Sequence, residues 1–153
     1  MSPRVSIHVL SNAHVEAVAA ASPAWAHAIP SLLERGRTGR STTFVALRAD
    51  AALGLAELTS EDDPELKNVG VLPAVQGQGI GTRLITAAEQ HAAVSHDRIR
   101  LRVGLDNPRA RRLYERLGYA RTGQMTTVTY EYIDDAGLRH TATETDEWMV
   151  KQI

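Results

Sequence analysis

The chain has 153 residues, of which 43% are hydrophobic and 23% are charged, with a formal net charge of −1 and no cysteine. This length favours a single domain spanning residues 1–153, large enough to bury a sizeable core. The lack of cysteine excludes disulfides, thiolate metal sites and a cysteine nucleophile, and the near-neutral charge argues against a general nucleic-acid or membrane surface.

Hydrophobic periodicity alternates between strand-like and helix-like along the chain. We expect strands at residues 5–10, 42–47, 53–58, 66–71, 98–103, 127–133 and 141–151. We expect a short helix from residue 14 and longer helices at 23–35, 79–94 and 108–117. Pro30 lies inside the second of these helices and is predicted to break or kink it. Residues 36–41 are expected to form a loop.

A glycine-rich loop follows the strand at 66–71. Gly77, Gly79 and Gly81 stand at every second position, directly before an amphipathic helix. Glycines let backbone N–H groups converge, and the start of the helix adds unpaired donors and the positive end of its dipole. This pattern predicts a phosphate or pyrophosphate site, although a tight turn that binds nothing would use the same glycines.

Two familiar phosphate-binding motifs fit this loop poorly. A P-loop needs a lysine after its last glycine, where this chain has Thr82 and Arg83. A Rossmann fingerprint needs a third glycine at the position of Thr82 and an acid at the end of the next strand. That strand is instead flanked by Asp97 before it and Asp106 beyond it.

A second pattern begins about thirty residues further on, at Asn107. Asn107 is predicted to cap a helix that starts at Pro108 and stops at Gly118. Its apolar positions recur at helical spacing and form one face: Ala110, Leu113, Tyr114 and Leu117. Tyr114 therefore points inward with a hydroxyl that needs a partner, as an ordinary core tyrosine also would.

These two segments resemble the two motifs of the GCN5-related N-acetyltransferase (GNAT) superfamily. Gln76, Gly79 and Gly81 match its acetyl-coenzyme A loop, and the helix from Asn107 to Tyr114 matches its second motif, in the expected order and separation. The resemblance covers nearly the whole chain. It implies an α/β fold with a mixed, mostly antiparallel sheet of six to seven strands. This sheet would be splayed at the cofactor loop and carry helices on both faces.

The resemblance also implies which residues hold acetyl-CoA. They are Val69, Val71, Leu72, Gln76, Gly77, Gln78, Gly79, Ile80, Gly81, Thr82, Asn107 and Arg111. The pantetheine arm would pair with the free edge at 69–71, and a backbone N–H near Val71 or Leu72 would polarise the thioester carbonyl. Arg83, Arg109 and Arg112 are further candidates for the phosphates. No metal is expected, because the six histidines are scattered.

The implied reaction is acetyl transfer to an amine by direct attack. Tyr114 would act as hydrogen-bond donor or general acid toward the departing thiolate. Glu57 is the first candidate for the base, acting through water. Glu65 is the second candidate, and a solvated strand-end carboxylate remains an alternative for Glu57.

The acceptor is expected to be a small amine or a peptide amine. The regions that bound the acceptor cleft in this family contain Trp25, His27, Tyr130, Tyr132, Trp148 and several acids, including Glu144 and Glu147. We expect a cytoplasmic protein without nucleic-acid or membrane partners, and assembly as a homodimer is left open. The alternatives are an inactive acetyl-CoA sensor, or an unrelated nucleotide-binding domain that prefers ATP or NAD.

Overall fold

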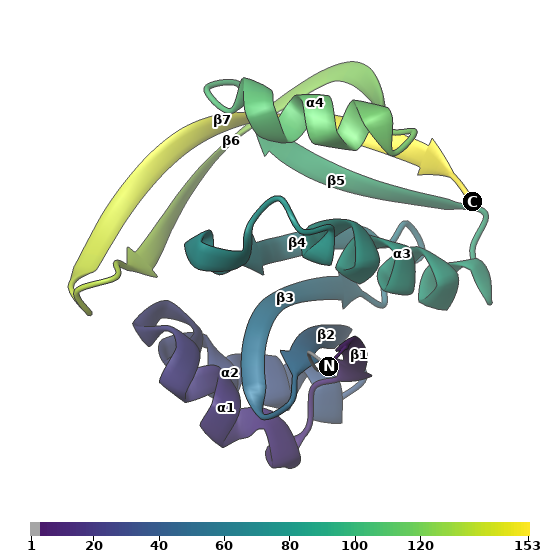
Figure 1. Ribbon diagram of the computed structural model, residues 1–153. Helices are drawn as coiled ribbons and strands as arrows, with labels where there is room; N and C mark the ends of the chain where they lie inside the picture. The colour runs from purple at the N-terminus through teal and green to yellow at the C-terminus, as the bar shows by residue number, and fades with distance from the viewer. Residues whose placement is uncertain (1–3) are drawn as a thin grey trace.

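Segments with the strand period alternate with amphipathic helices in the computed structural model, which describes residues 4–153 (Figure 1). The strands are β1 (Val5–Val9), β2 (Ser41–Arg48), β3 (Ala51–Thr59), β4 (Glu65–Val71), β5 (Arg98–Gly104), β6 (Ala120–Ile133) and β7 (Arg139–Gln152). The helices are α1 (Val15–Ala21), α2 (Pro23–Arg37), α3 (Ile80–Ala93) and α4 (Pro108–Arg116), with short 3-10 turns η1 (Asn12–His14) and η2 (Pro73–Val75). The predicted α/β fold is confirmed.

Helices cover both faces of the sheet, and successive side chains of β2 are buried against one face and then the other. Phe44 and Ala46 belong to the core beneath α3, together with Leu84. Val45, between them, packs in a second core with Val18 of α1 and residues of α2. Since successive strand residues point to opposite faces, a strand buried on both sides has a continuous apolar run, as β2 does.

The sheet has the order β1-β2-β3-β4-β5-β7-β6. Every neighbouring pair is antiparallel except β4 and β5, which run parallel and pair only through Glu65 with Arg100 and Leu66 with Leu101. Along the described chain, β4 beyond Leu66 therefore pairs only with β3. This opening between β4 and β5 is the predicted splay, and Figure 1 shows the two strands diverging.

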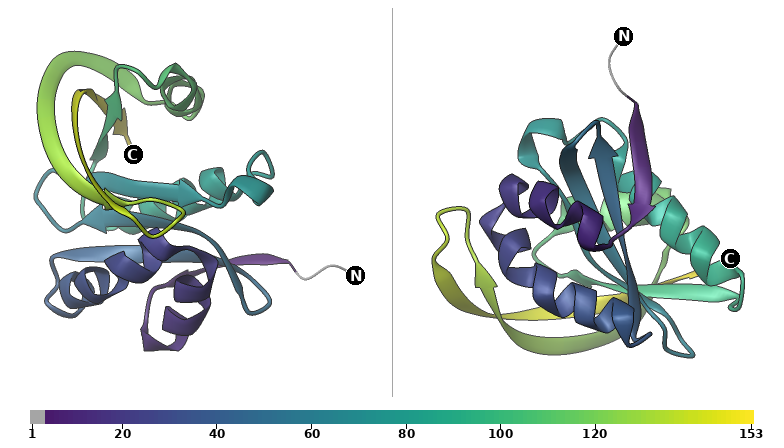
Figure 2. Two further views of the ribbon diagram at one scale, coloured as in Figure 1. Left: turned by 90° about the vertical axis from the view of Figure 1, so that its left-hand side faces the viewer. Right: turned by 90° about the horizontal axis from the view of Figure 1, so that it is seen from below.

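The β6–β7 arm, residues 125–147, is a long hairpin at the edge of the sheet. Its two strands pair from Met125 opposite Glu147 to Ile133 opposite Arg139. Figure 2 shows the arm curving from the α4 side of the molecule round to the face that carries α1 and α2. Its tip lies close to α2, so it encloses space on that face.

The structure corrects several predicted boundaries. Helix α2 is not broken at Pro30 but continues to Arg37, because packing of Ile29 and Leu32 into the second core outweighs the hydrogen bond that proline cannot donate. The loop after α2 is shorter than predicted, since Ser41 already begins β2. Strands β6 and β7 are longer than predicted because they support each other beyond the apolar stretches.

The helices can be compared with membrane-spanning helices in length and hydrophobicity. Among residues 4–153, no helix combines the length and apolar character needed to cross a bilayer.

Candidate active site

The loop between β4 and α3 needs glycine at two positions. Gly77 has φ 79° and Gly79 has φ 81°, both in the left-handed region that side chains rarely adopt. No atom lies within 4 Å of the place where a Cβ would stand at either residue. Backbone conformation, not crowding, therefore explains these glycines.

The backbone amides of residues 77–82 are available for a ligand. On either side of them, the N–H of Val75 donates to Leu72 O at 3.0 Å and the N–H of Arg83 donates to Gly79 O at 3.1 Å. The N–H of Gln76 donates to Pro73 O at 3.4 Å, and within the described residues no acceptor takes a hydrogen bond from the amides of residues 77–82. The first N–H groups of α3 are unpaired as in any helix and carry its positive dipole end, so this segment can receive an anion.

These amides border a groove of about 480 Å³ between the loop and α4, the cofactor groove. Most of the predicted cofactor residues line it: Val69, Val71, Gln76, Gly77, Gly79, Ile80, Gly81, Thr82 and Asn107. Tyr114 lines the same groove, together with Ala110 and Leu113 of α4. Two motifs about thirty residues apart are thus brought together, because α3 and α4 both lie on the same face of the splayed sheet.

Three predicted cofactor residues do not line the groove. Leu72 donates its N–H to Leu53 O of β3 at 2.9 Å. The side-chain oxygen of Gln78 accepts from Arg48 Nη2 at 3.1 Å. Arg111 lies 3.7 Å from the Glu115 carboxylate, one helical turn away on α4. Their assignment to the cofactor stays a prediction, and each has a partner within the protein.

The basic residues of the groove are Arg109, a candidate from the sequence, and Arg116, which sequence reasoning missed. Arg116 stands seven residues after Arg109, so the two lie on one helix face, and this spacing was a usable signal. The guanidinium of Arg83, a further candidate for the phosphates, donates one hydrogen bond to the backbone carbonyl of Val5 in β1.

Tyr114 projects from α4 into the cofactor groove. Its ring meets that of Tyr119 edge-on, with 5.9 Å between centroids. Burial raises the pKa of the Tyr114 phenol above its ordinary value. No hydrogen-bond partner for its hydroxyl occurs in the described part of the chain, so this proton can be offered to a ligand.

Asn107, by contrast, has one atom committed to the fold. Its Oδ1 caps α4 by accepting from Ala110 N at 3.2 Å, as predicted, with Pro108 in the first turn. The amide nitrogen of the same side chain remains for the groove.

The backbone of β4 decides between the two predicted oxyanion donors. Because Leu72 N–H is bonded to β3, it is excluded from this role. Successive N–H groups of a strand point in opposite directions, so the N–H of Val71 points into the splay. Val71 also lines the cofactor groove and is the remaining candidate.

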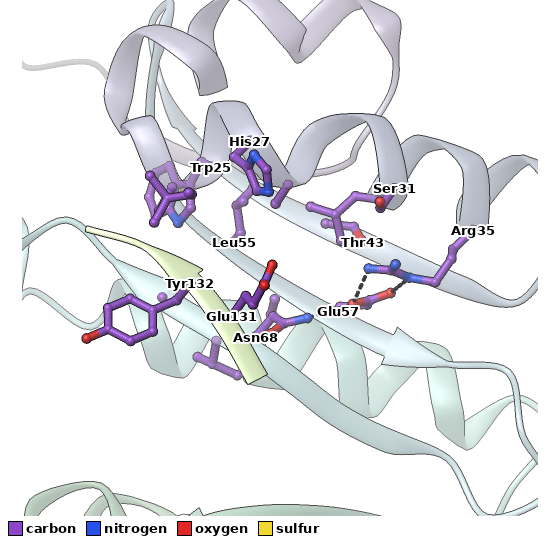
Figure 3. Close-up of a pocket in the computed structure, with 17 residues that line it drawn as sticks. Trp25, His27, Ser31, Arg35, Thr43, Leu55, Glu57, Asn68, Glu131 and Tyr132 are labelled. Atoms are coloured by element: carbon purple, nitrogen blue, oxygen red, sulfur yellow. Dashed lines mark hydrogen bonds and ion pairs between the residues drawn. The ribbon is translucent and has the colours of Figure 1, made fainter. Parts of the chain in front are cut away.

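A second cavity, the α2 pocket, has a volume of about 340 Å³ and lies on the opposite face of the sheet. Figure 3 shows Trp25 and His27 of α2 facing it, with Tyr132 from the tip of the β6–β7 arm. Glu57 and Asn68 form part of its floor. Val69 lines both this pocket and the cofactor groove, so the two cavities meet at β4, beside the splay.

The carboxylate of Glu57 is buried, and both of its oxygens accept hydrogen bonds. Arg35 donates to both oxygens, at 2.7 Å and 3.1 Å, as the dashed lines of Figure 3 mark. Ser41 Oγ donates at 2.6 Å and Asn68 Nδ2 at 2.8 Å. Burial by itself raises the pKa of this carboxyl, but the hydrogen bonds, that of Arg35 first, outweigh burial and lower it. A carboxylate held in this way is a weak proton acceptor.

Asn68 reaches Glu57 through an unusual backbone conformation. Its φ is 54°, in the left-handed region, where β4 bulges against β3. Asparagine tolerates this conformation better than most residues. An Asn in the middle of a strand is the signal by which the sequence could have revealed this bulge.

Glu65, the second candidate base, is also paired. Its Oε2 lies 2.9 Å from Arg102 Nε, and only 7% of the residue is exposed. The neighbouring Arg98 and Arg100 pair with acids of the loop after β3.

Comparison with known families is consistent with this geometry. Residues 11–119 match the model of the acetyltransferase (GNAT) family. The chain belongs to the GNAT acetyltransferase family. This match includes both the glycine loop and the Asn107–Tyr114 helix, whereas the β6–β7 arm lies beyond it.

Solved GNAT structures have the same fold over almost the entire chain. The PaiA N-acetyltransferase of Thermoplasma acidophilum, determined in complex with coenzyme A, has a TM-score of 0.73 at 16% identity, covering 98% of this chain and 99% of that one. The ribosomal-protein-S18-alanine N-acetyltransferase of Escherichia coli has a TM-score of 0.71 at 21% identity, covering 98% and 94%. The structural similarity establishes the GNAT fold. At such low sequence identity it leaves the acceptor open.

A curated relative shares more sequence over a shorter region. The mycothiol acetyltransferase of Gordonia bronchialis is 41% identical over 88 residues, which is 54% of this chain. The aligned region is only 28% of the relative's own length. GNAT membership therefore accounts for the shared segment, and the relative's whole activity does not transfer with it.

Proposed function

We propose that this protein transfers the acetyl group of acetyl-CoA to an amine, by direct attack of the amine on the thioester. The observation that carries the proposal is the meeting of two cavities at Val69, one on each face of the sheet. The cofactor groove would hold the pyrophosphate on the amides of residues 77–82, with the pantetheine arm along β4. The acceptor would approach from the face that carries α2.

The groups in the groove fit the needs of thioester aminolysis. As the tetrahedral intermediate forms, negative charge develops on the thioester oxygen, where the N–H of Val71 would donate. Losing one such donor typically raises the barrier by about 3 kcal/mol. As the C–S bond breaks, Tyr114 would donate its proton to the sulfur; a phenol is protonated at neutral pH, and burial raises the pKa of this one further.

The activities of proteins with similar structures support an amine acceptor. These proteins include a spermidine N-acetyltransferase chimera from Vibrio cholerae and the alanine N-acetyltransferase of E. coli already described, which act on a polyamine and on a protein amine. We therefore propose that the acceptor is a small amine or a peptide amine, which would approach through the α2 pocket.

The proposal is tested by binding and by thiol release. Calorimetric titration should detect coenzyme A and acetyl-CoA binding and little affinity for ATP or NAD. A free-thiol assay with a panel of amines and alanine-ended peptides should then show acceptor-dependent release of coenzyme A. Cofactor binding without release by any acceptor would favour a sensor of acetyl-CoA, and stronger binding of ATP or NAD would reject the cofactor assignment.

A further inference from the structure

A third cavity, the arm groove, separates β4 and β5 from the β6–β7 arm and has a volume of about 600 Å³. The charged residues of its lining are four acids and two bases: Glu65, Glu131, Glu144, Asp146, Lys67 and Arg102. Asn68 lines both this groove and the α2 pocket, and the next residue, Val69, lines the cofactor groove. The arm groove therefore opens beside the place where the thioester is proposed to lie.

Asp146 is an unsatisfied carboxylate inside this groove. The residue is only 6% exposed, and its Oδ1 has no hydrogen-bond partner in the described part of the chain. Buried polar atoms without partners are uncommon, and each calls for an explanation such as an absent ligand. Glu57 and Glu65, in contrast, are already paired with arginines.

Other carboxylates converge on the same point. A Cβ built on Gly104, which pairs with Asp146 across the strands, would lie 2.7 Å from Asp106 Oδ1, 3.2 Å from Glu144 Oε2 and 3.6 Å from Asp146 Oδ1. The absence of a side chain at Gly104 leaves room for these three carboxylates. Such a concentration of negative charge attracts a cation.

The sheet register places this cluster across the splay from the middle of β4. Arg100 of β5 pairs with Glu65 of β4, and Gly104 lies four residues further along β5. The equivalent distance along β4 reaches Val69, since the two strands run parallel. Asp146 is therefore level with the junction of the cavities, on the acceptor face.

We propose that the arm groove receives the acceptor as an ammonium ion and that Asp146 takes the proton from it. This inference rests on the proposed acetyl transfer. The first ammonium proton passes to Asp146 Oδ1, and the free amine attacks the thioester carbonyl. The C–N bond forms, the C–S bond breaks and Tyr114 protonates the sulfur. The second N–H proton then replaces the one that Tyr114 gave, and Asp146 returns its proton to solvent.

The surroundings of Asp146 suit this role. Burial raises the pKa of its carboxyl; Arg102 opposes the rise, and Asp106 and Glu65 add to it. The charged and titratable groups near it are Glu65, Arg102, Asp106, Tyr130 and Glu144, and Lys67 and Glu131 line the same groove. A raised pKa brings a carboxylate closer to the working range of a general base at neutral pH.

The test compares Asp146→Asn with Asp135→Asn, a change in the exposed turn of the arm. Asp146→Asn should fold, because Oδ1 donates or accepts no hydrogen bond that the change would break. The probes are ethylamine, which is protonated at neutral pH, and trifluoroethylamine, which is largely unprotonated. We expect Asp146→Asn to lower kcat/KM about 100-fold for ethylamine and less than tenfold for trifluoroethylamine, with unchanged affinity for coenzyme A. Asp135→Asn should match the unmodified protein for both amines.

Equal losses for both amines, or no loss, would overturn the role of Asp146 while leaving acetyl transfer intact. If the unmodified protein released no coenzyme A with any amine, the proposed function would fail, and a carboxyl-detected NMR titration with ethylammonium would decide on the site. A shift of the Asp146 resonance, absent from Asp146→Asn, would support the ammonium site, and no shift would reject it.

Discussion

The guanidinium of Arg35 donates two hydrogen bonds to the carboxylate of Glu57, from Nε to Oε2 at 2.7 Å and from Nη2 to Oε1 at 3.1 Å. Arg35 belongs to α2 and Glu57 to β3, so this pair ties the helix to the sheet beside the α2 pocket. Only 1% of the Glu57 side chain is exposed. Its charge is thus held in one place in the pocket wall, which disfavours the predicted role as a base.

We expect Arg35→Met to lower the free energy of unfolding by about 2 kcal/mol, because it leaves a buried carboxylate without its cation. This is less than the 3–5 kcal/mol lost when a fully buried pair is broken, since one third of the Arg35 side chain is exposed and solvent screens it. Urea denaturation at pH 7 measures the change. Arg37→Met, which removes an exposed pair on the same helix, is the control and should leave the midpoint unchanged.

The same carboxylate should contribute to the loss of unfolding free energy at acidic pH. Its pKa is lowered in the folded state, so the stabilisation is fully present above the unfolded value near 4.5 and is lost as the pH falls through the lower folded value. Unfolding free energies measured from pH 7 downward should therefore fall more steeply below about pH 4.5 for the unmodified protein than for Glu57→Gln. Parallel curves would show that Glu57 has an ordinary pKa in the folded protein.

Tyr114→Phe should lower turnover more than about tenfold and leave the affinity for coenzyme A nearly unchanged, because only the departing sulfur loses its donor. Since burial raises the pKa of this phenol above 10.0, no loss of rate from its ionisation is expected below that pH. Tyr119→Phe is the matched control. It removes a hydrogen bond to Glu89 at 2.9 Å, outside the groove, and should affect stability only. Normal turnover in Tyr114→Phe would leave this tyrosine a packing role alone.

Gly79→Ala should weaken coenzyme A binding at least tenfold. A left-handed backbone costs a residue with a Cβ about 1–2 kcal/mol, so the loop would relax and its amides would turn away from the ligand. Gly137→Ala in the arm turn is the control, since its φ of 82° and open surroundings match those of Gly79. Both variants should lose similar stability, and calorimetry should find weaker binding in Gly79→Ala alone. Equal affinities would mean that the loop does not hold the cofactor.

Arg109 and Arg116, which line the cofactor groove, should contribute to coenzyme A affinity, whereas Arg111 on the same helix should not. Arg116→Gln is expected to weaken coenzyme A binding about threefold to tenfold at low salt, and less at high salt, where screening reduces the attraction to phosphate. Arg111→Gln should bind normally, because Arg111 faces Glu115. A loss of binding confined to Arg111→Gln would support the sequence-based assignment of Arg111 to the cofactor.

The sequence predicted the parts of the site that depend on local backbone chemistry. Gly77 and Gly79 adopt the left-handed conformations that their pattern indicated, and Asn107 caps α4 as expected. It did not indicate the contacts of individual side chains, such as that of Arg111 with Glu115 and that of Gln78 with Arg48. A helix or loop position offers several directions, and neighbours from other segments select one of them.

The sequence by itself determined the order of elements, the glycine loop with its free amides and the helix that carries Tyr114, because turns, caps and periodicity are encoded within a few residues. Only the tertiary structure decided that Arg35 and Asn68 bond the carboxylate of Glu57, and that Oδ1 of Asp146 has no partner among residues 4–153. These facts depend on the register between strands that are distant in the chain. A shift of one residue in that register would move each side chain to the opposite face of the sheet.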